Sequence, residues 1–217
     1  MATTTIENYV KEIFLVENDN PDFPVPMGKV AKALRVVPGT ATTMVKSMQR
    51  ENLLDYEPRV GVNLTKKGRE LAIRMIRRHR LIEVFLVEVL KLDWGEIHKD
   101  AEELEHVVSD RILAKIDELC NYPEYDPHGD PIPRPDGTYD QVQHKSLMDC
   151  PMEKDLSIQR IRDQEQDFLK FAMDNGFTPG AKIKVLRRCD IAGAVTIENG
   201  NGQMSLGTKV AEKIWVA

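Results

Sequence analysis

Four residues near the middle of the chain place imidazole and carboxylate groups at helical spacing: His98, Glu102, Glu105 and His106. Because each residue of an α-helix turns by about 100°, these four side chains would lie within an arc of about 100° on one face. Nitrogen and oxygen ligands of this kind bind divalent transition metals. The spacing therefore predicts a metal site, and the alternative is a solvated helix face in a chain that holds 35 acidic residues.

A second pair, His79 and Glu83, lies four residues apart on the preceding apolar segment, so both side chains would project from one side of a helix. Each histidine taken alone is more typical of a helix surface or an ordinary core than of a metal ligand. The interpretation of this pair as metal ligands is strengthened because the other cluster follows on the next predicted helix, and a metal centre needs several such groups close in space.

Hydrophobic periodicity predicts the elements that would position these groups. Steps of three and four residues predict helices over residues 6–16, 27–34, 40–52, 67–90 and about 96–120. The second and third of these are short and joined by a tight turn, which is typical of a helix-turn-helix. Two β-like runs between Leu53 and Thr65 flank a tip that contains Pro and Gly, which predicts a hairpin wing.

The C-terminal part of the chain has a different pattern. Residues 121–137 hold five prolines and two glycines, which predicts an irregular connector, and the polar residues 138–154 are interpreted as a linker. Beyond residue 155, short β-like runs separated by turns predict a small β-barrel with one helix over 164–175. The predicted strands are residues 157–161, 182–187, 194–198, 203–206 and 213–216.

The predicted fold class is therefore mainly α with a small β part. Its domains are a winged helix-turn-helix over 1–66, a helical metal-binding and dimerisation domain over 67–137, the linker over 138–154 and the barrel over 155–217.

Charge is unevenly distributed along the chain. The net charge is −5, but residues 27–82 carry 13 Lys or Arg against 4 Asp or Glu, and the remainder is acidic. A basic segment attracts phosphate groups. The distribution favours DNA binding by the helix-turn-helix over the alternative that these basic residues only solvate their helices.

The second helix of the predicted helix-turn-helix presents small and hydroxyl-bearing residues at its N-terminal half. Such residues let the backbone approach the major groove and favour contacts to thymine methyl groups and phosphates. The residues expected there are Pro38, Gly39, Thr40, Thr42, Thr43 and Lys46. The residues expected to meet phosphates are Lys29, Lys32, Lys46, Arg50 and, at the wing tip, Arg59.

Other features exclude several classes of protein. The N-terminus lacks the pattern of a signal peptide and no long apolar run is present, so we expect a cytoplasmic protein without a membrane contact. Three widely separated cysteines, Cys120, Cys150 and Cys189, indicate reduced thiols and not a disulfide framework. Catalytic motifs such as HExxH or a phosphate-binding Gly loop are missing, so we do not expect an enzyme.

The order of these parts resembles the diphtheria-toxin-repressor family of iron- and manganese-dependent regulators. The resemblance covers nearly the whole chain and rests on the string His79-Arg80-Leu81-Ile82-Glu83, on the cluster from His98 to Asp110, and on the connector Pro127-His128-Gly129-Asp130-Pro131. It implies a C-terminal SH3-like (FeoA-like) domain and two metal sites per subunit.

By this resemblance, His79, Glu83 and His98 match one site, which groups of the SH3-like domain complete. The nearest candidates for those groups are Glu165, with Asp163 or Gln166.

Glu102, Glu105 and His106 match the other, regulatory site. In relatives this site also takes a side chain from the first helix, where Asn8 stands here, and sometimes one from the connector, where Asp126 stands. Iron-type members have a thiolate at the position of Glu102. A site with only oxygen and nitrogen ligands points to Mn²⁺, with Fe²⁺ as the alternative.

The sequence therefore predicts a metal-dependent transcriptional repressor that binds palindromic operator DNA as a homodimer and controls metal homeostasis genes. Two alternatives remain open at this point. One is a metal-binding enzyme, and the other is a winged-helix DNA binder that metal does not regulate. Metal-dependent DNA binding would separate the three.

Overall fold

The computed structural model describes residues 3–19, 24–138, 144–162 and 165–217. The chain divides into two compact units, Met1–His79 with Pro133–Tyr139 and Arg80–Ile132 with Asp140–Ala217. None of the helices in the described ranges is long and apolar enough to cross a membrane.

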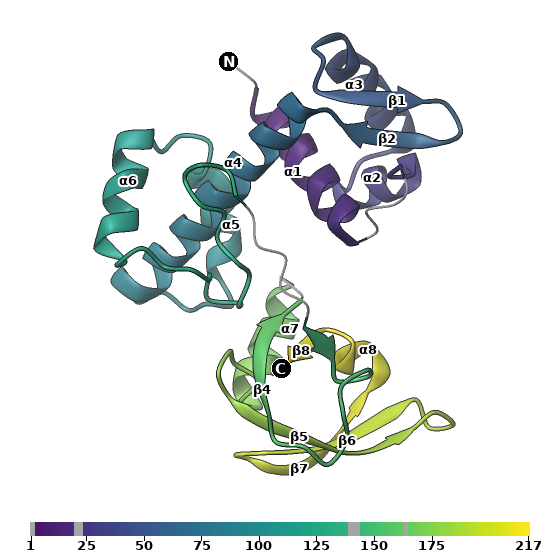
Figure 1. Ribbon diagram of the computed structural model, residues 1–217, viewed down its shortest axis with the longest axis vertical. Coiled ribbons are helices and arrows are strands. Elements are labelled where there is room, and N and C mark those ends of the chain that lie inside the picture. Colours follow the sequence, from purple (N-terminus) through teal and green to yellow (C-terminus); the bar gives the residue numbers. More distant parts are fainter. Residues whose placement is uncertain (1–2, 20–23, 139–143, 163–164) are drawn as a thin grey trace. The chain divides into compact units, whose positions relative to one another are not determined.

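The first unit contains the predicted winged helix-turn-helix (Figure 1). Its elements are α1 (Thr4–Asp19), α2 (Met27–Ala33), α3 (Pro38–Arg50), β1 (Leu54–Glu57) and β2 (Gly61–Leu64). Helix α3 begins two residues earlier than the periodicity predicted, because Pro38 occupies the first helical position, where a missing N–H costs nothing. The antiparallel hairpin β1–β2 forms the wing.

Two contacts hold the base of the wing. Val25 pairs with Val62 across two backbone hydrogen bonds, and a Cβ at Gly61 would lie 2.5 Å from the Val25 carbonyl oxygen, so only glycine fits there. The buried carboxylate of Glu17 on α1 accepts a hydrogen bond from the Leu64 N–H at 3.2 Å and pairs with Arg69 at 2.7 Å. The wing is thus fixed to both α1 and the helix that follows it.

The long helix predicted over 67–90 is present as α4 (Lys66–Val84), which continues into one π-helical turn, η1 (Phe85–Val89). The boundary between the two units falls inside α4, after His79, but the helix itself is unbroken. The residues of α4 on either side of the boundary therefore keep ordinary helical spacing.

The prediction of a single helix over residues 96–120 is wrong. The structure has α5 (Ile97–Leu104) and α6 (Asp110–Leu119), separated by a turn. Ser109 starts the second helix, since its hydroxyl accepts a hydrogen bond from the Ile112 N–H at 3.3 Å. The apolar periodicity continues through Leu104 and Val108, so it concealed the break that the Ser-Asp pair marks.

The rest of the second unit is a six-stranded antiparallel sheet in the order β3-β8-β4-β5-β6-β7. Its strands are β3 (Lys145–Ser146), β4 (Leu156–Ile161), β5 (Lys182–Cys189), β6 (Ala194–Asn199), β7 (Gly202–Gly207) and β8 (Ile214–Val216). Two helices accompany it, α7 (Gln166–Asp174) and the short α8 (Thr208–Ala211). Five strands and α7 were predicted within a few residues of these bounds.

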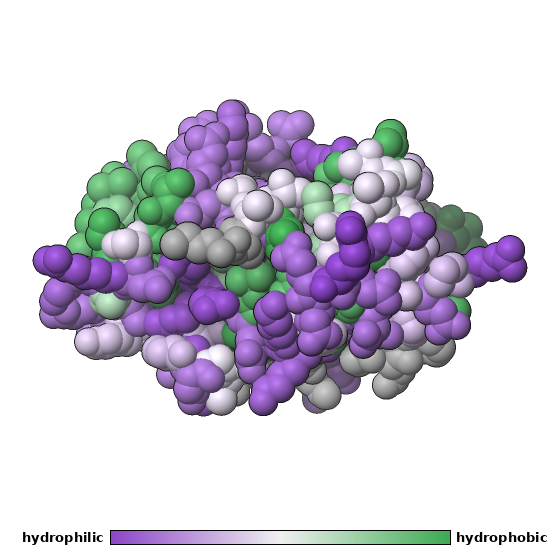
Figure 2. Space-filling view, turned by 90° about the horizontal axis from the view of Figure 1, so that it is seen from above, coloured by the Kyte–Doolittle hydropathy of each residue, from purple (hydrophilic) through white to green (hydrophobic). Residues whose placement is uncertain are grey.

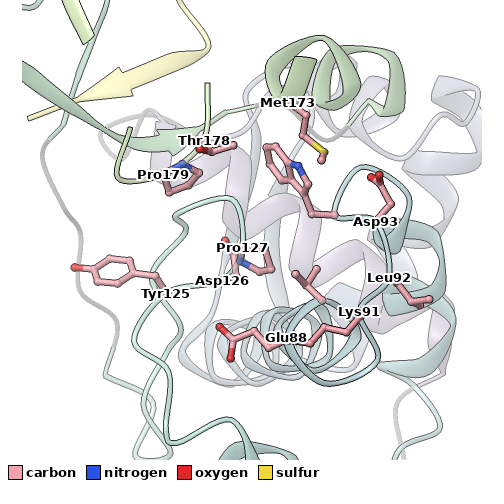
Figure 3. A pocket seen from close by; sticks show the side chains of 12 residues that line it. Glu88, Lys91, Leu92, Asp93, Tyr125, Asp126, Pro127, Met173, Thr178 and Pro179 are labelled. Carbon is pink, nitrogen blue, oxygen red and sulfur yellow. The ribbon is translucent and has the colours of Figure 1, made fainter. Parts of the chain in front are cut away.

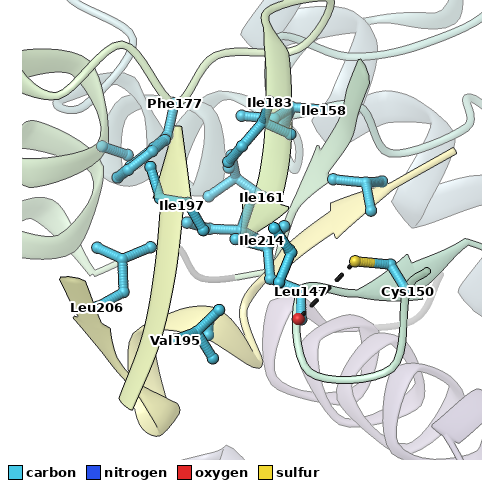
Figure 4. Close-up of a cluster of buried hydrophobic side chains, with 14 of the residues drawn as sticks. Leu147, Cys150, Ile158, Ile161, Phe177, Ile183, Val195, Ile197, Leu206 and Ile214 are labelled. Atoms are coloured by element: carbon cyan, nitrogen blue, oxygen red, sulfur yellow. Dashed lines mark hydrogen bonds between the residues drawn. The ribbon is translucent and has the colours of Figure 1, made fainter. Parts of the chain in front are cut away.

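The interpretation of residues 138–154 as a linker is wrong for its C-terminal part. Strand β3 pairs with β8 at the edge of the sheet, and Leu147 and Cys150 are buried in the core of the sheet (Figure 4). The Cys150 thiol donates to the Leu147 carbonyl oxygen at 3.8 Å, which closes the turn after β3. Periodicity could not predict this element, because the segment is short and polar and has only two buried apolar positions.

Candidate functional site

One group of potential metal ligands lies where α4 meets α5. His79 and Glu83 are one turn apart on α4, His98 is on α5, and each offers a ligand atom within 4.8 Å of the other two. The carboxylate of Glu83 is fully buried, and its Oε1 lies 3.3 Å from Nδ1 of His98. A buried carboxylate beside imidazoles is an arrangement that a divalent cation stabilises.

A second group combines His79 with Glu102 and Glu105, again within 4.8 Å. His106 is adjacent, with its Nε2 3.4 Å from Oε1 of the fully buried Glu105. The sequence predicted that Glu102, Glu105 and His106 share one helical face with His98. Glu105, the C-cap of α5, keeps the helical register, because its N–H donates to the Ala101 carbonyl oxygen at 2.9 Å. His106 lies in the turn after the helix, so the prediction does not hold for this residue.

His79 belongs to both groups. One imidazole nitrogen binds one metal ion, so the two groups share a ligand unless each is completed by other residues. The sequence assigned His79 only to the group of Glu83 and His98, and the structure also places it within 4.8 Å of Glu102 and Glu105.

His128 in the connector is a residue that the sequence analysis did not assign to a site. Its side chain is fully buried, its Nε2 lies 4.0 Å from Oε1 of Glu83, and its ring packs against Trp94 at 4.8 Å between centroids. Two imidazoles, those of His98 and His128, therefore face the same carboxylate oxygen. The signal was available in the Pro-His-Gly string, but no spacing rule connects a connector residue to a helix 45 positions earlier.

Asp126 lies beside Arg80 in the structure. Its Oδ2 is 3.6 Å from the Arg80 Nε, and its Oδ1 accepts hydrogen bonds from the backbone N–H groups of His128 and Asp130 at 2.9 Å each. Burial raises the pKa of Asp126 well above its ordinary value, the carboxylates of Asp130 and Glu83 raise it further, and Arg80 opposes them. The expected grouping of Asp126 with Glu102 and Glu105 is not among the ligand groups within the described residues.

The remaining predicted ligands are placed as follows. Glu165 is exposed at the N-cap of α7, Gln166 donates to Oε1 of Glu96 at 3.1 Å, and Asp163 is outside the described residues. Asn8 lies on α1, and within the described chain no hydrogen-bond donor reaches its buried Oδ1. These residues remain predictions as ligands.

Next to the connector is an open cavity of about 510 Å³ (Figure 3). One wall is η1 and the loop that carries Trp94, a second is Asp126 and Pro127 of the connector, and a third is Met173, Thr178 and Pro179 of the sheet domain. Asp126 and Pro127 of the connector therefore border this cavity.

The predicted DNA-binding residues gather at the exposed surface of the first unit. Pro38, Gly39 and Thr40 form the exposed first turn of α3, followed by Thr43, Lys46 and Arg50, with Thr42 half-buried. Lys29 and Lys32 are exposed on α2, and Arg59 is exposed at the wing tip.

The hydroxyls of Thr42 and Thr43 donate to the carbonyl oxygens of Pro38 and Gly39 at 2.8 and 3.0 Å. These hydroxyls are therefore already engaged within the helix, which favours contacts of thymine methyl groups over hydroxyl bonds to bases.

Apolar residues are exposed on and around α6. Val107, Ile112, Leu119 and Tyr122 are 76%, 54%, 62% and 66% exposed. Ile112 and Leu119 are seven residues apart and lie on one helical face. Figure 2 shows hydrophobic surface gathered on its left, the side on which Figure 1 draws α6.

Comparison with known proteins identifies the family. Residues 1–62 match the iron dependent repressor, N-terminal DNA binding domain, and residues 65–134 match the iron dependent repressor, metal binding and dimerisation domain. The chain belongs to the iron-dependent repressor family. Residues 145–217 match the FeoA domain, and this match includes β3 and the buried residues after it.

Relatives in this family are similar over most of their length. The iron-dependent repressor IdeR of Mycobacterium tuberculosis is 30% identical over 194 residues, which are 83% of each chain. A solved manganese-dependent transcriptional repressor in complex with manganese is 35% identical with a TM-score of 0.89, covering 98% of this chain and 99% of that one. ScaR with bound Zn²⁺ is 31% identical with a TM-score of 0.82 and 98% of both chains covered.

Family membership decides between the functional hypotheses. The expected fold class and the resemblance to metal-dependent repressors are confirmed. A metal-independent winged helix and a metalloenzyme are not favoured, because the iron-dependent repressor family consists of metal-dependent transcriptional regulators.

Proposed function

We propose that this protein is a Mn²⁺-activated transcriptional repressor with two metal positions per subunit, which binds a palindromic operator as a homodimer and controls metal homeostasis genes. The observation that carries the proposal is the meeting of three carboxylates, Glu83, Glu102 and Glu105, with imidazoles at the junction of α4 and α5. Buried like charges repel one another, and a divalent cation offsets this repulsion.

The regulatory position is formed by Glu102, Glu105 and His79, with His106 beside Glu105. Asn8 is proposed as a further ligand, supported by its buried Oδ1, which has no hydrogen-bond partner within the described residues. These are carboxylate, amide and imidazole donors, the set that suits Mn²⁺ and Fe²⁺.

The second position is formed by Glu83, His98 and His128. We assign His79 to the regulatory position, because Glu83 already faces two other imidazoles, whereas His79 is the imidazole that lies within 4.8 Å of both Glu102 and Glu105. Asp126, Glu165 and Asp163 are candidate additional ligands of this position.

The choice of Mn²⁺ over Fe²⁺ follows from the donor set. Neither group of ligands within the described residues includes a thiolate, and Cys120, Cys150 and Cys189 are not members of them. Soft sulfur ligands favour later transition metals, so their absence from these groups favours the harder Mn²⁺. Similar repressors of known structure are named for manganese and one holds Zn²⁺, so selectivity is expected to be a matter of degree.

DNA binding is assigned to α3 and the wing, and dimerisation to the apolar face of α6. A symmetric dimer spaces two copies of α3 for successive major grooves of a palindrome. Metal at the regulatory position would hold α5 against α4 and thereby favour the arrangement that binds DNA.

The decisive experiment measures operator affinity with increasing Mn²⁺, Fe²⁺ and Zn²⁺ under anaerobic conditions for the parent protein and for Glu105→Gln and His106→Ala. Glu103→Gln is a matched control, because Glu103 is exposed on the same segment and belongs to neither ligand group. We expect the first two variants to remain folded and lose the metal response, and the control to keep it. An equal response of all four proteins to Mn²⁺ would show that the cluster is ordinary helix surface.

A second substitution tests the metal preference. Glu102→Cys should shift the response toward softer metals such as Fe²⁺, Co²⁺ or Zn²⁺ without abolishing it. A variant whose order of metal preference equals that of the parent would show that Glu102 is not a ligand.

Asp126→Asn tests whether this aspartate is a ligand. The amide oxygen of Asn can accept the same two backbone hydrogen bonds as Oδ1 of Asp126, so these bonds of the loop are kept, while the ion pair with Arg80 is lost. A loss of Mn²⁺ affinity in this variant would assign the carboxylate to the second position, and an unchanged affinity would exclude it.

A further inference from the structure

The part of the connector that carries His128 contacts β4 of the sheet domain through its backbone. The backbone N–H of Ile161 donates to the His128 carbonyl oxygen at 2.8 Å. A Cβ added at Gly129, whose φ is +87°, would lie 1.8 Å from the Gln159 carbonyl oxygen. The backbone of the connector therefore lies directly against that of β4, and only glycine allows this approach.

A shared carboxylate adds an ionic contact to this backbone contact. Oδ1 of Asp130 lies 3.0 Å from Nη2 of Arg80 on α4 and 2.5 Å from Nη2 of Arg160 on β4. Asp130 thus links the connector to the helix that bears Glu83 on one side and to the sheet on the other. Arg160 is also held over the ring of Trp215, at 5.7 Å from its centroid, so its guanidinium is fixed in direction.

The loop between these contacts is a closed unit. The Asp126 N–H donates to the Asp130 carbonyl oxygen at 2.9 Å, and Oδ1 of Asp126 accepts from two backbone N–H groups of the same loop. A displacement of Asp130 would therefore move His128 with it. The open cavity lies on the side of Asp126 and Pro127 (Figure 3), and the loop is held by its contacts to Arg80, to β4 and to the ring of Trp94.

We propose that Arg160 is a positioning residue for the second metal position, because its ion pair with Asp130 seats the connector on β4 so that His128 faces Glu83. The sheet domain then supports this metal position through the connector, in addition to any ligand that it supplies itself. This inference rests on the proposed function, in which His128 and Glu83 bind the same ion.

The test is Arg160→Met in the full-length protein, titrated with Mn²⁺ while the free ion is followed by electron paramagnetic resonance. Loss of a group that orients a ligand typically weakens metal binding by about 10- to 100-fold. We expect the affinity of one of the two bound Mn²⁺ equivalents to fall by about 10-fold or more, and the other equivalent to be unchanged. Arg160→Lys, which keeps the charge but loses the planar geometry, should recover part of the loss.

A second measurement is made without metal. Hydrogen exchange of the backbone amides of residues 126–131 and of Ile161 should be faster in Arg160→Met than in the parent protein, with the remainder of the sheet unchanged. Arg187→Met is the matched control, since Arg187 is an exposed arginine on β5, at a position that pairs with Thr196 of β6. It should behave as the parent in both measurements.

Three outcomes are distinguishable. If the parent protein binds no Mn²⁺, the proposed function fails. If the parent binds two equivalents and His128→Ala weakens one of them while Arg160→Met weakens neither, only the positioning inference is overturned. If Arg160→Met weakens both equivalents together with a general loss of thermal stability, Arg160 supports the fold and not the site, and the inference is again overturned.

Discussion

Gly39 gives a test in which stability and DNA binding should change in opposite directions. It is the second residue of α3, it is exposed, and a Cβ placed on it would meet nothing within 4 Å. Its φ is not in the left-handed region, so alanine can adopt the same backbone conformation. Nothing within the described protein therefore requires glycine at this position.

The effect of Gly39→Ala on stability follows from helix propensity. Alanine in a helix is more favourable than glycine by about 0.5 to 1 kcal/mol, and a site near the helix end lies at the lower limit. The expected gain in the free energy of unfolding is about 0.5 kcal/mol. For a chain of this size that corresponds to a rise in Tm of about 1 to 2 °C.

The effect on operator binding should be unfavourable. If the backbone of this turn approaches DNA closely, an added methyl group displaces it and weakens the contacts made there. Loss of a good DNA contact costs about 1 to 2 kcal/mol, which is about a 5- to 30-fold lower affinity. Fluorescence anisotropy with saturating Mn²⁺ would measure this affinity, and thermal unfolding would measure stability on the same sample.

Gly207→Ala is the control, because Gly207 is also exposed, has open space at its Cβ position and lies in the sheet domain. It should leave operator affinity unchanged. Full operator affinity in Gly39→Ala, with the expected gain in stability, would show that the first turn of α3 does not approach DNA and that the recognition surface lies elsewhere.

Three further predictions concern other parts of the chain. Lys46→Gln should lower affinity for all DNA sequences and reduce the slope of log affinity against log salt by about 0.9, as one lost phosphate contact does, and an unchanged slope would contradict the assignment of Lys46. Ile112→Asp places a charge on the exposed apolar face of α6 and should convert the dimer to a folded monomer in sedimentation velocity, whereas a stable dimer would exclude this face as the interface. Burial, followed by the charge of Arg160, lowers the pKa of His144, so the unfolded chain binds a proton near its ordinary pKa of about 6.5 while the folded chain does not. The free energy of unfolding should therefore fall as the pH is lowered from about 7 to 5. Urea unfolding at these two pH values should show a smaller fall for His144→Gln than for the parent protein. An identical pH dependence of the two proteins would contradict this prediction.

Local patterns in the sequence predicted most of the fold. The helices of the first unit and the wing have strong periodicity, and turn residues bound them, so their ends were found within a few residues. The break between α5 and α6 was missed because hydrophobic spacing continues across it, and only the capping side chain of Ser109 marks the start of a new helix. Strand β3 was missed because two residues are too few to show alternation.

The site could be predicted only in part. His79, Glu83, His98, Glu102 and Glu105 were found because they lie one helical turn apart or in a short cluster, and the structure brings their side chains together. The placement of His128 beside Glu83 could not be predicted from spacing, since the backbone contact that holds it joins it to a strand 33 residues later in the chain.

The position of His79 connects the proposed metal site to the DNA-binding unit. It lies on α4, and α4 is one continuous helix from Lys66 to Val84. At its first turn, a Cβ on Gly68 would lie 1.9 Å from the Leu53 carbonyl oxygen, so the start of α4 is in direct contact with the residue that precedes the wing. Under the proposed assignment, binding of an ion by His79, Glu102 and Glu105 fixes α5 to a helix that is itself fixed to the wing. We therefore expect this continuous helix to couple metal binding to DNA binding. A helix-breaking change between them, Ile73→Pro, should therefore uncouple operator affinity from Mn²⁺ if the winged helix-turn-helix still folds, which its basal binding to DNA at low salt would report.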